Sequence, residues 1–225
     1  MLEKEKLPVH RGTLMRKTNS HELKIDINKK NYEDIFLING TSFLTEEISN
    51  SDLKIKPNSY YMIINIGKDV LNIHYNRDIS RYKIIYHPYK YESSKKINLK
   101  PELFKKKYNI PKGYTDTLPK WYSFKFTYPD YNLIFIRPEF GLSIQTHKYR
   151  NEFWEILEGK PIIINGNKVH YFVESKTTFQ NLINTYHSII NPNKERNKFV
   201  LVKERWNGRF DENDIERVYN PNYYE

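Results

Sequence analysis

Short apolar segments alternate with polar turns along most of this chain. Between residues 60 and 87, three segments rich in Ile and Tyr are separated by Gly-Lys-Asp and Asn-Arg-Asp sequences, and a longer series follows Trp121. Apolar segments of four to eight residues bounded by turn residues predict β-strands. We predict strands at 60–66, 70–74, 82–87, 122–127, 132–137, 142–146, 153–158, 161–164, 168–174, 187–190 and 198–204.

Two regions break this pattern. Residues 1–30 are polar and of mixed charge, and 93–120 combine lysine pairs and triplets with three prolines, which indicates a connection carrying one short helix at 101–108. We place a domain boundary within this connection, just after the helix. Residues 1–110 then form a β-rich N-terminal region, and residues 111–225 form a second domain. A second short helix is predicted at 212–218.

The strand pattern favours one fold class. The sequence Ile164-Asn165-Gly166-Asn167 predicts a tight hairpin, because Asn-Gly accepts the positive φ of a type I′ turn. Many short strands with tight turns and few helical periods predict a mainly β protein, an antiparallel sandwich or barrel.

Composition narrows the classes of function. The 225 residues are 15% aromatic, contain no cysteine and carry a net charge of +10. The aromatic content argues against a disordered chain, and the lack of cysteine excludes disulfides, thiolate metal sites and cysteine nucleophiles. We see no signal peptide and no apolar run approaching the roughly 20 residues of a membrane span, so a cytoplasmic protein is expected. Alanine is absent while Ile, Asn, Lys and Tyr abound, as in AT-rich coding sequences; the basic charge is therefore weak evidence for nucleic-acid binding.

One stretch offers metal-ligating chemistry. Gln145 and His147 share a face of a predicted strand, Glu152 follows five residues later, and His187 precedes Asn191 by four. Imidazole nitrogens with a carboxylate and an amide oxygen form a mixed site that suits Zn, Fe, Mn, Co or Ni and leaves positions open for substrate.

These residues carry a resemblance to the cupin superfamily. The segment Leu142–Trp154 resembles the first motif of type II mannose-6-phosphate isomerases, a group that includes the isomerase domain of mannose-1-phosphate guanylyltransferase/mannose-6-phosphate isomerase. Further matches are the interval from Glu152 to Gly159, the spacing of His187 and Asn191, and the tail sequence Glu212-Asn213-Asp214-Ile215-Glu216-Arg217. The resemblance therefore covers about residues 118–220. Departures are Tyr149 and Phe153, where the family has histidines, and a C-terminus without the family's Tyr-Gly-Arg.

The resemblance implies a fold, a metal site and a reaction. It implies a cupin-type jelly-roll barrel in the C-terminal half, with the N-terminal region as a degenerate second cupin. The implied metal ligands are Gln145, His147, Glu152 and His187, with zinc the first choice of metal. The implied reaction is the isomerisation of mannose 6-phosphate to fructose 6-phosphate, for which Arg217, Lys120 and Arg150 are the candidates for acid–base catalysis or phosphate binding.

Several alternatives stay open. The chain lacks a Gly-rich phosphate loop, so nucleotidyl transfer is not expected. A non-catalytic or divergent cupin, which binds sugar, has a structural role or epimerises another sugar, is the alternative to the isomerase. A phosphorylated hexose is the expected partner, and family precedent allows a homodimer; neither membrane nor nucleic-acid binding is expected.

Overall fold

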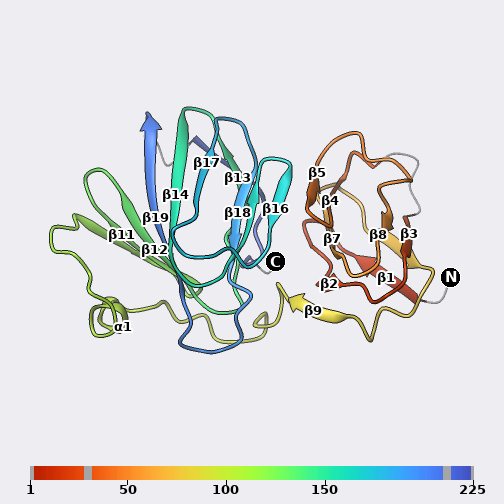
Figure 1. The fold of residues 1–225 in the computed structure, drawn as a ribbon, viewed down its shortest axis with the longest axis horizontal. Helices are drawn as coiled ribbons and strands as arrows, with labels where there is room; N and C mark the ends of the chain where they lie inside the picture. Colours follow the sequence, from red (N-terminus) through yellow and green to blue (C-terminus); the bar gives the residue numbers. More distant parts are fainter. Residues whose placement is uncertain (1–2, 28–31, 210–213, 224–225) are drawn as a thin grey trace.

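The protein is built almost entirely from antiparallel β-strands. The computed structural model describes residues 3–27, 32–209 and 214–223, which form two β structures side by side (Figure 1). The mainly β class predicted from the pattern is confirmed. Among the described residues, no helix is long and apolar enough to cross a membrane.

The described part of the N-terminal half contains nine strands. They are β1 (Glu3–Leu7), β2 (Met15–Lys17), β3 (Leu23–Ile27), β4 (Ile35–Asn39), β5 (Ser42–Leu44), β6 (Lys54–Ile55), β7 (Tyr60–Asn65), β8 (Leu71–Tyr75) and β9 (Lys83–Tyr86). One sheet has the order β1-β8-β3-β6, and β5-β4-β7-β2-β9 form part of a ten-stranded sheet. A buried cluster that includes Leu23, Tyr61, Ile73 and Tyr75 joins them. The predicted β-rich N-terminal region is therefore present.

In the C-terminal half, the residues that the structure describes form eleven strands and one helix. They are α1 (Pro101–Lys105), β10 (Asp116–Pro119), β11 (Ser123–Thr127), β12 (Asn132–Ile136), β13 (Ile144–His147), β14 (Arg150–Glu158), β15 (Ile162–Asn165), β16 (Lys168–His170), β17 (Thr178–Asn181), β18 (His187–Ile190), β19 (Val200–Gly208) and β20 (Ile215–Tyr219). A six-stranded sheet β10-β11-β12-β19-β14-β17 faces β20-β13-β18-β15-β16 across a core that includes Trp154, Ile156, Ile189 and Val202. This is the predicted cupin-type barrel.

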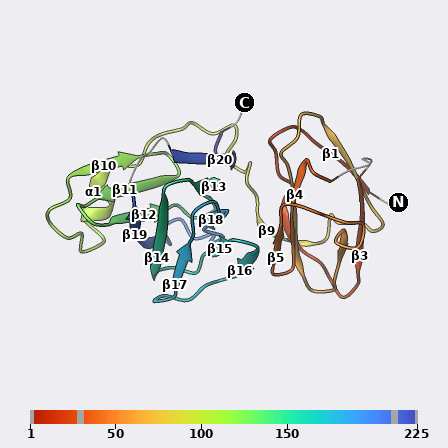
Figure 2. The same cartoon turned by 90° about the horizontal axis from the view of Figure 1, so that it is seen from above.

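The two halves share one sheet. The ten-stranded sheet runs from β20 to β9 and passes between the halves where β16 pairs with β5 at Lys168 and Ser42 (Figure 2). In β4, Ile35 and Leu37 pack in the N-terminal core, while Phe36 and Ile38 pack in a cluster shared with strands of the C-terminal half. Because both faces are covered, β4 is a continuous apolar run rather than an alternating one.

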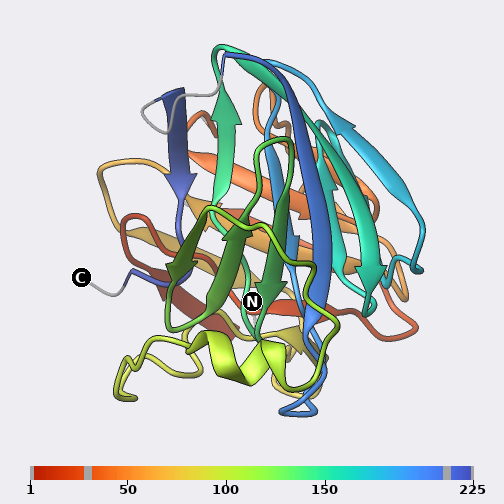
Figure 3. The same ribbon diagram turned by 90° about the vertical axis from the view of Figure 1, so that its left-hand side faces the viewer.

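The connection between the halves packs on the C-terminal half. The helix α1 lies beneath the C-terminal strands, in yellow-green at the bottom of Figure 3. The side chain of Phe104 in α1 is fully buried among Phe124, Phe135 and Phe199. The helix begins at Pro101, as predicted, but ends at Lys105, before the predicted end at residue 108. The division of the chain at residues 110 and 111 stays a prediction.

Two local predictions are wrong. The expected helix over 212–218 is instead strand β20, because pairing with β13, which sets Gln145 opposite Arg217, outweighs local helix propensity. Glu212 and Asn213 lie outside the described residues. The hairpin between β15 and β16 is present, but its central residues are Gly166 and Asn167, and only Gly166 has a positive φ (59°). This matches a type II′ turn instead of type I′.

Several strands have no counterpart in the prediction. β3 alternates buried Leu23, Ile25 and Ile27 with exposed Lys24 and Asp26, within a region that reads as polar overall. β17 is short and mostly polar, and β20 mixes apolar and charged residues; both are strands because they pair with neighbouring strands. Composition alone does not reveal such segments.

Candidate metal centre

The two facing sheets of the C-terminal half bring the predicted ligands together inside the barrel. Gln145 and His147 lie on β13, His187 on β18 and Glu152 on β14. Gln145 is paired directly with His187 across the β13–β18 ladder. On β14 every second side chain from Arg150 onward points inward, so Glu152 faces the histidines.

His147, Glu152 and His187 form a compact cluster. Their ligand atoms all lie within 4.8 Å of one another. His147 Nε2 lies 2.9 Å from Glu152 Oε1, and His187 Nε2 lies 3.6 Å from Glu152 Oε2. All three side chains are buried. Two histidines and one carboxylate are a ligand set that binds Zn²⁺ in proteins. This is the one group of three such ligands found among the described residues.

The histidines are oriented by their other ring nitrogens. His147 Nδ1 lies 3.1 Å from Asp214 Oδ1, and His187 Nδ1 lies 3.0 Å from the carbonyl oxygen of Thr185. In the tautomer in which Nδ1–H donates to these oxygens, each Nε2 has a lone pair that can bind a metal ion. His187 Nε2 is buried without a hydrogen-bond partner. A divalent cation between these atoms would satisfy the orphaned nitrogen, so the residues fit a metal.

A buried arginine, Arg150, supplies a positive charge next to the carboxylates at this site. Arg150 Nε donates to Glu152 Oε1 at 3.1 Å, and Nη1 donates to Asp214 Oδ1. Burial by itself would raise the pKa of Glu152, but the hydrogen bond with His147 and the electrostatic effect of the protonated forms of His187 and His147 and of Arg150 lower it to about 2. Burial lowers the pKa of His187 to about 4. At neutral pH Glu152 is a carboxylate and His187 a neutral imidazole, the forms that bind metal.

The fourth predicted ligand lies at the edge of the cluster. Gln145 is half-buried, and its Oε1 accepts a hydrogen bond of 2.8 Å from the hydroxyl of Ser143. It lines the same cleft as Glu152 and His187. Its role as a metal ligand stays a prediction.

A solvent-open cleft leads from the surface to the cluster. Besides Gln145, Glu152 and His187, its lining includes all three residues that the resemblance suggested for catalysis, Lys120, Arg150 and Arg217. Lys120 is half-buried and Arg217, on β20, is exposed. The cleft thus brings the more accessible cations Lys120 and Arg217 into the same space as the buried Arg150, Glu152 and His187. The roles of these three residues stay predictions.

Sequence reasoning missed Asp214 and Glu204. Asp214 belongs to the tail motif but had no assigned role, although it contacts both His147 and Arg150. Glu204 lies on β19 and lines the cleft. The alternation Val200-x-Val202-x-Glu204 is the signal that could have placed it on the inner face.

Glu204 and Glu152 are linked by an indole. Trp154 Nε1 lies 3.2 Å from Glu152 Oε2 and 3.3 Å from Glu204 Oε2, and Asn132 Nδ2 donates to Glu204 Oε1 at 2.7 Å. Burial and the charge of Glu152 raise the pKa of Glu204 to about 7. Two carboxyls in one cleft therefore have pKa values pushed in opposite directions, as in sites that use acid–base pairs.

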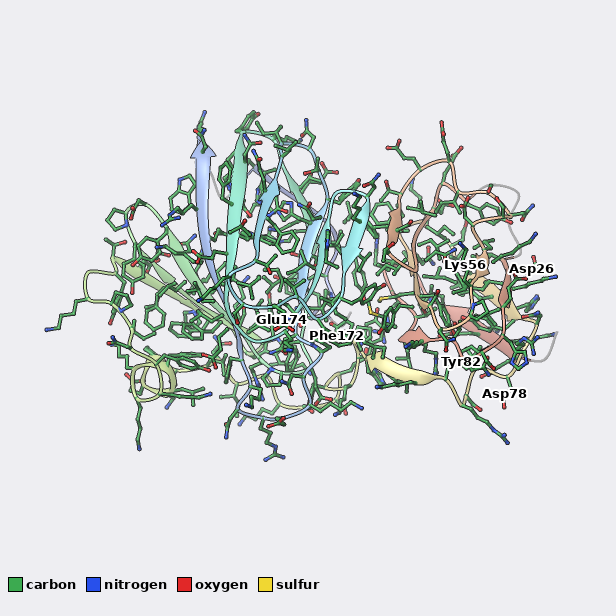
Figure 4. All side chains as sticks on the ribbon, viewed as in Figure 1. Asp26, Lys56, Asp78, Tyr82, Phe172 and Glu174 are labelled. Atoms are coloured by element: carbon green, nitrogen blue, oxygen red, sulfur yellow. The ribbon has the colours of Figure 1, made fainter. Side chains whose placement is uncertain are left out.

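Other regions lack such a group. Within the described part of the N-terminal half no cluster of three potential ligands occurs. Its carboxylates Asp26 and Asp78 are exposed at the end farthest from the C-terminal sheets (Figure 4). The chemistry is therefore concentrated in the C-terminal barrel.

Known structures share parts of this architecture at low identity. A sugar phosphate isomerase from a cupin superfamily of Silicibacter pomeroyi is 13% identical and covers 40% of this chain, with a TM-score of 0.33. The chain spans 60% of the length of that protein. The oxalate decarboxylase of Lactobacillus farciminis is 9% identical over 95% of this chain and 78% of its own (TM-score 0.38). A Cupin 2 conserved barrel domain protein from Leptotrichia buccalis is 13% identical over 90% and 81% (TM-score 0.30).

Family assignment comes from the sequence of the barrel. No curated protein sequence matches the chain. The family model described as mannose-6-phosphate isomerase C-terminal matches residues 105–220, which is half of the chain and includes the whole metal-ligand cluster, the cleft cations and Asp214. This protein belongs to the mannose-6-phosphate isomerase C-terminal family.

Proposed function

We propose that this protein is a metal-dependent aldose–ketose isomerase that interconverts mannose 6-phosphate and fructose 6-phosphate. The observation that carries the proposal is a cleft lined by Lys120 and Arg217 that reaches Glu152 and His187, two members of the cluster they form with His147. A sugar phosphate needs metal ligands and phosphate-binding cations in separate parts of the cleft, because its reacting carbons and its phosphate lie at opposite ends of the molecule.

Each set of residues has a task in this scheme. The chemistry that a divalent metal supplies when bound by His147, Glu152 and His187 is Lewis-acid polarisation of the sugar's carbonyl and hydroxyl oxygens. Lys120 and Arg217 bind the phosphate, as a point charge and through paired N–H groups respectively. Arg150 bonds to Glu152 and Asp214, so its charge stabilises the cluster from within.

The family departures at Tyr149 and Phe153 do not line this cleft. Tyr149 is 54% exposed, and Phe153, on the outward face of β14, is 38% exposed. These substitutions therefore leave the groups around the proposed substrate intact, which favours an active enzyme over a cupin that has lost catalysis.

The alternative is a non-catalytic or divergent cupin. It is favoured by the segment Asn220–Glu225, whose residues differ from the family's Tyr-Gly-Arg motif. The homodimer suggested by family precedent and the cytoplasmic location expected from the sequence stay predictions.

The test is proton NMR of mannose 6-phosphate in D2O with the purified protein, with and without a chelator. Chelator-sensitive deuterium at C2 and the appearance of fructose 6-phosphate are expected. Exchange without ketose would favour an epimerase-like relative. No exchange with added Zn, Mn, Co or Ni would favour the non-catalytic cupin or another sugar.

A further inference from the structure

Glu204 is a buried carboxyl on the wall of the cleft that has no part in the metal cluster. The β14–β19 register pairs Trp154 with Glu204 and Glu152 with Trp206. Glu204 and Glu152 are therefore diagonal neighbours on adjacent strands, and both lie on the inner face of the six-stranded sheet. Glu204 is 8% exposed and reaches the cleft beside the cluster.

Two neutral donors fix the position of this carboxyl. Asn132 on β12 donates to Oε1 at 2.7 Å, and the indole of Trp154 on β14 lies 3.3 Å from Oε2. Strands on both sides of β19 thus hold the group at one depth in the cleft. A carboxylate oxygen can accept more than one hydrogen bond, so each oxygen keeps a lone pair for a further proton.

Other ionisable groups of the cleft are less suited to accept a proton from carbon. Glu152 faces both histidines and Arg150. Arg217 and Arg150 cannot act as bases, because a guanidinium stays protonated. The reaction needs a group that accepts a proton from carbon and returns it, and a positioned carboxyl is suited to this.

We propose that Glu204 is the catalytic acid–base that carries the proton between C2 and C1 of the bound sugar phosphate. The proposal rests on the proposed isomerase function and deepens it. Glu152 then serves the metal, Lys120 and Arg217 hold the phosphate, and Glu204 contacts the reacting carbons.

The proton transfers balance without any further reactant. The Glu204 carboxylate removes the proton from C2, the C2–H electron pair forms the C1=C2 bond, and the carbonyl π pair moves to O1. O1 takes up the proton that the C2 hydroxyl releases. As the C2=O bond forms, the C1=C2 pair takes the proton back from Glu204 at C1, which gives the ketose and restores the carboxylate.

The test compares Glu204→Gln with Glu155→Gln in the full-length, metal-loaded protein. Glutamine keeps the size of the side chain but cannot take a proton, and Glu155 lies on the outward face of β14. C2 deuterium exchange, fructose 6-phosphate formation, metal content and thermal unfolding are measured for both. We expect E204Q to lose about 100-fold or more in exchange and turnover with its metal retained, since a general base contributes at least that much. E155Q should match the wild type.

The outcomes separate the two proposals. An active wild type with an E204Q rate within about 3-fold of it would overturn the role of Glu204 and leave the isomerase intact. Loss of metal from E204Q would also overturn it, because Glu204 would then belong to the metal site. A wild type without exchange would end both proposals. If E204Q does not fold, Glu204→Asp replaces it, which keeps the acid but withdraws it by one methylene; a wild-type rate in E204D would contradict the proposed contact.

Discussion

Nδ1 of His147 lies 3.1 Å from Oδ1 of Asp214, although 67 residues separate them in the chain. Both side chains are buried. The contact exists because β20 returns to pair with β13, which places His147 opposite Ile215, next to Asp214. The C-terminal segment therefore completes the metal centre by fixing the ring orientation of a proposed ligand.

We expect Asp214→Asn to weaken metal binding by about 10- to 100-fold, as the loss of a carboxylate behind a ligating histidine does elsewhere. Zinc titration against a competing chelator measures this. Glu216→Gln, an exposed change on the same strand, is the matched control and should bind like the wild type. Equal affinities in D214N and wild type would remove Asp214 from the centre.

Glu152→Gln should weaken metal binding and abolish turnover, because the amide lacks the charge that attracts the cation. A loss of at least about 100-fold in affinity is expected, larger than for a residue behind the ligands. Metal retained after gel filtration and the isomerisation rate are the two measurements. Unchanged metal content and rate would show that Glu152 does not bind the metal.

The free energy of unfolding of the metal-free protein should vary with pH because the pKa of Glu204 is raised in the folded state. The pKa of Glu204 in the folded protein is about 7, against an ordinary value of 4.5 for a glutamate side chain, so the folded protein binds more protons than the unfolded chain between these values. The contribution of Glu204 to stability is complete below pH 4.5 and is lost as pH rises through 7.

Glu204→Gln removes this titration. Between pH 4.5 and 7.5, the melting temperature of the wild type should therefore fall relative to that of E204Q by on the order of 5 °C. Thermal unfolding in the presence of chelator measures the difference. If the melting temperatures of the wild type and of E204Q depended on pH in the same way across this range, the raised pKa of Glu204 would be contradicted.

Arg217→Ala should lower kcat/KM for mannose 6-phosphate by about 10- to 100-fold, since a charged hydrogen bond to phosphate is lost. Arg217 is exposed, so the melting temperature should stay close to that of the wild type. Arg205→Ala, on the outward face of β19, is the control. Wild-type kinetics for R217A would mean that the tail resemblance is structural only.

Phe104→Ala should destabilise the protein by about 3–5 kcal/mol, because a fully buried ring is removed from an aromatic cluster. Leu103→Ala, its neighbour in α1 with 46% exposure, should cost less than about 1 kcal/mol. Denaturant unfolding of the two variants gives the difference. Similar losses would mean that α1 does not anchor the connection to the C-terminal sheets.

Most of the strands that the sequence predicts are short apolar runs between turn residues, although β4, which is also such a run, is not among them. β7, β12, β15 and β18 are short apolar runs, and each was placed within a residue or two of its observed ends. β20 was predicted as a helix because Ile215–Tyr219 reads as helical or extended with equal ease, and only its pairing with β13 decides. Strand formation in such segments depends on partners remote in sequence.

The sequence by itself determined the antiparallel β class, the family and the spacing of Gln145, His147, Glu152 and His187, because strand alternation and motif spacing are local properties of the chain. Tertiary structure decided what surrounds them. The register of β14 against β19 brings Glu204 beside Glu152, and the return of β20 brings Asp214 behind His147. Register and strand order are set by packing of the whole barrel, so the second carboxyl of the cleft and the support of the metal ligand could emerge only from the fold.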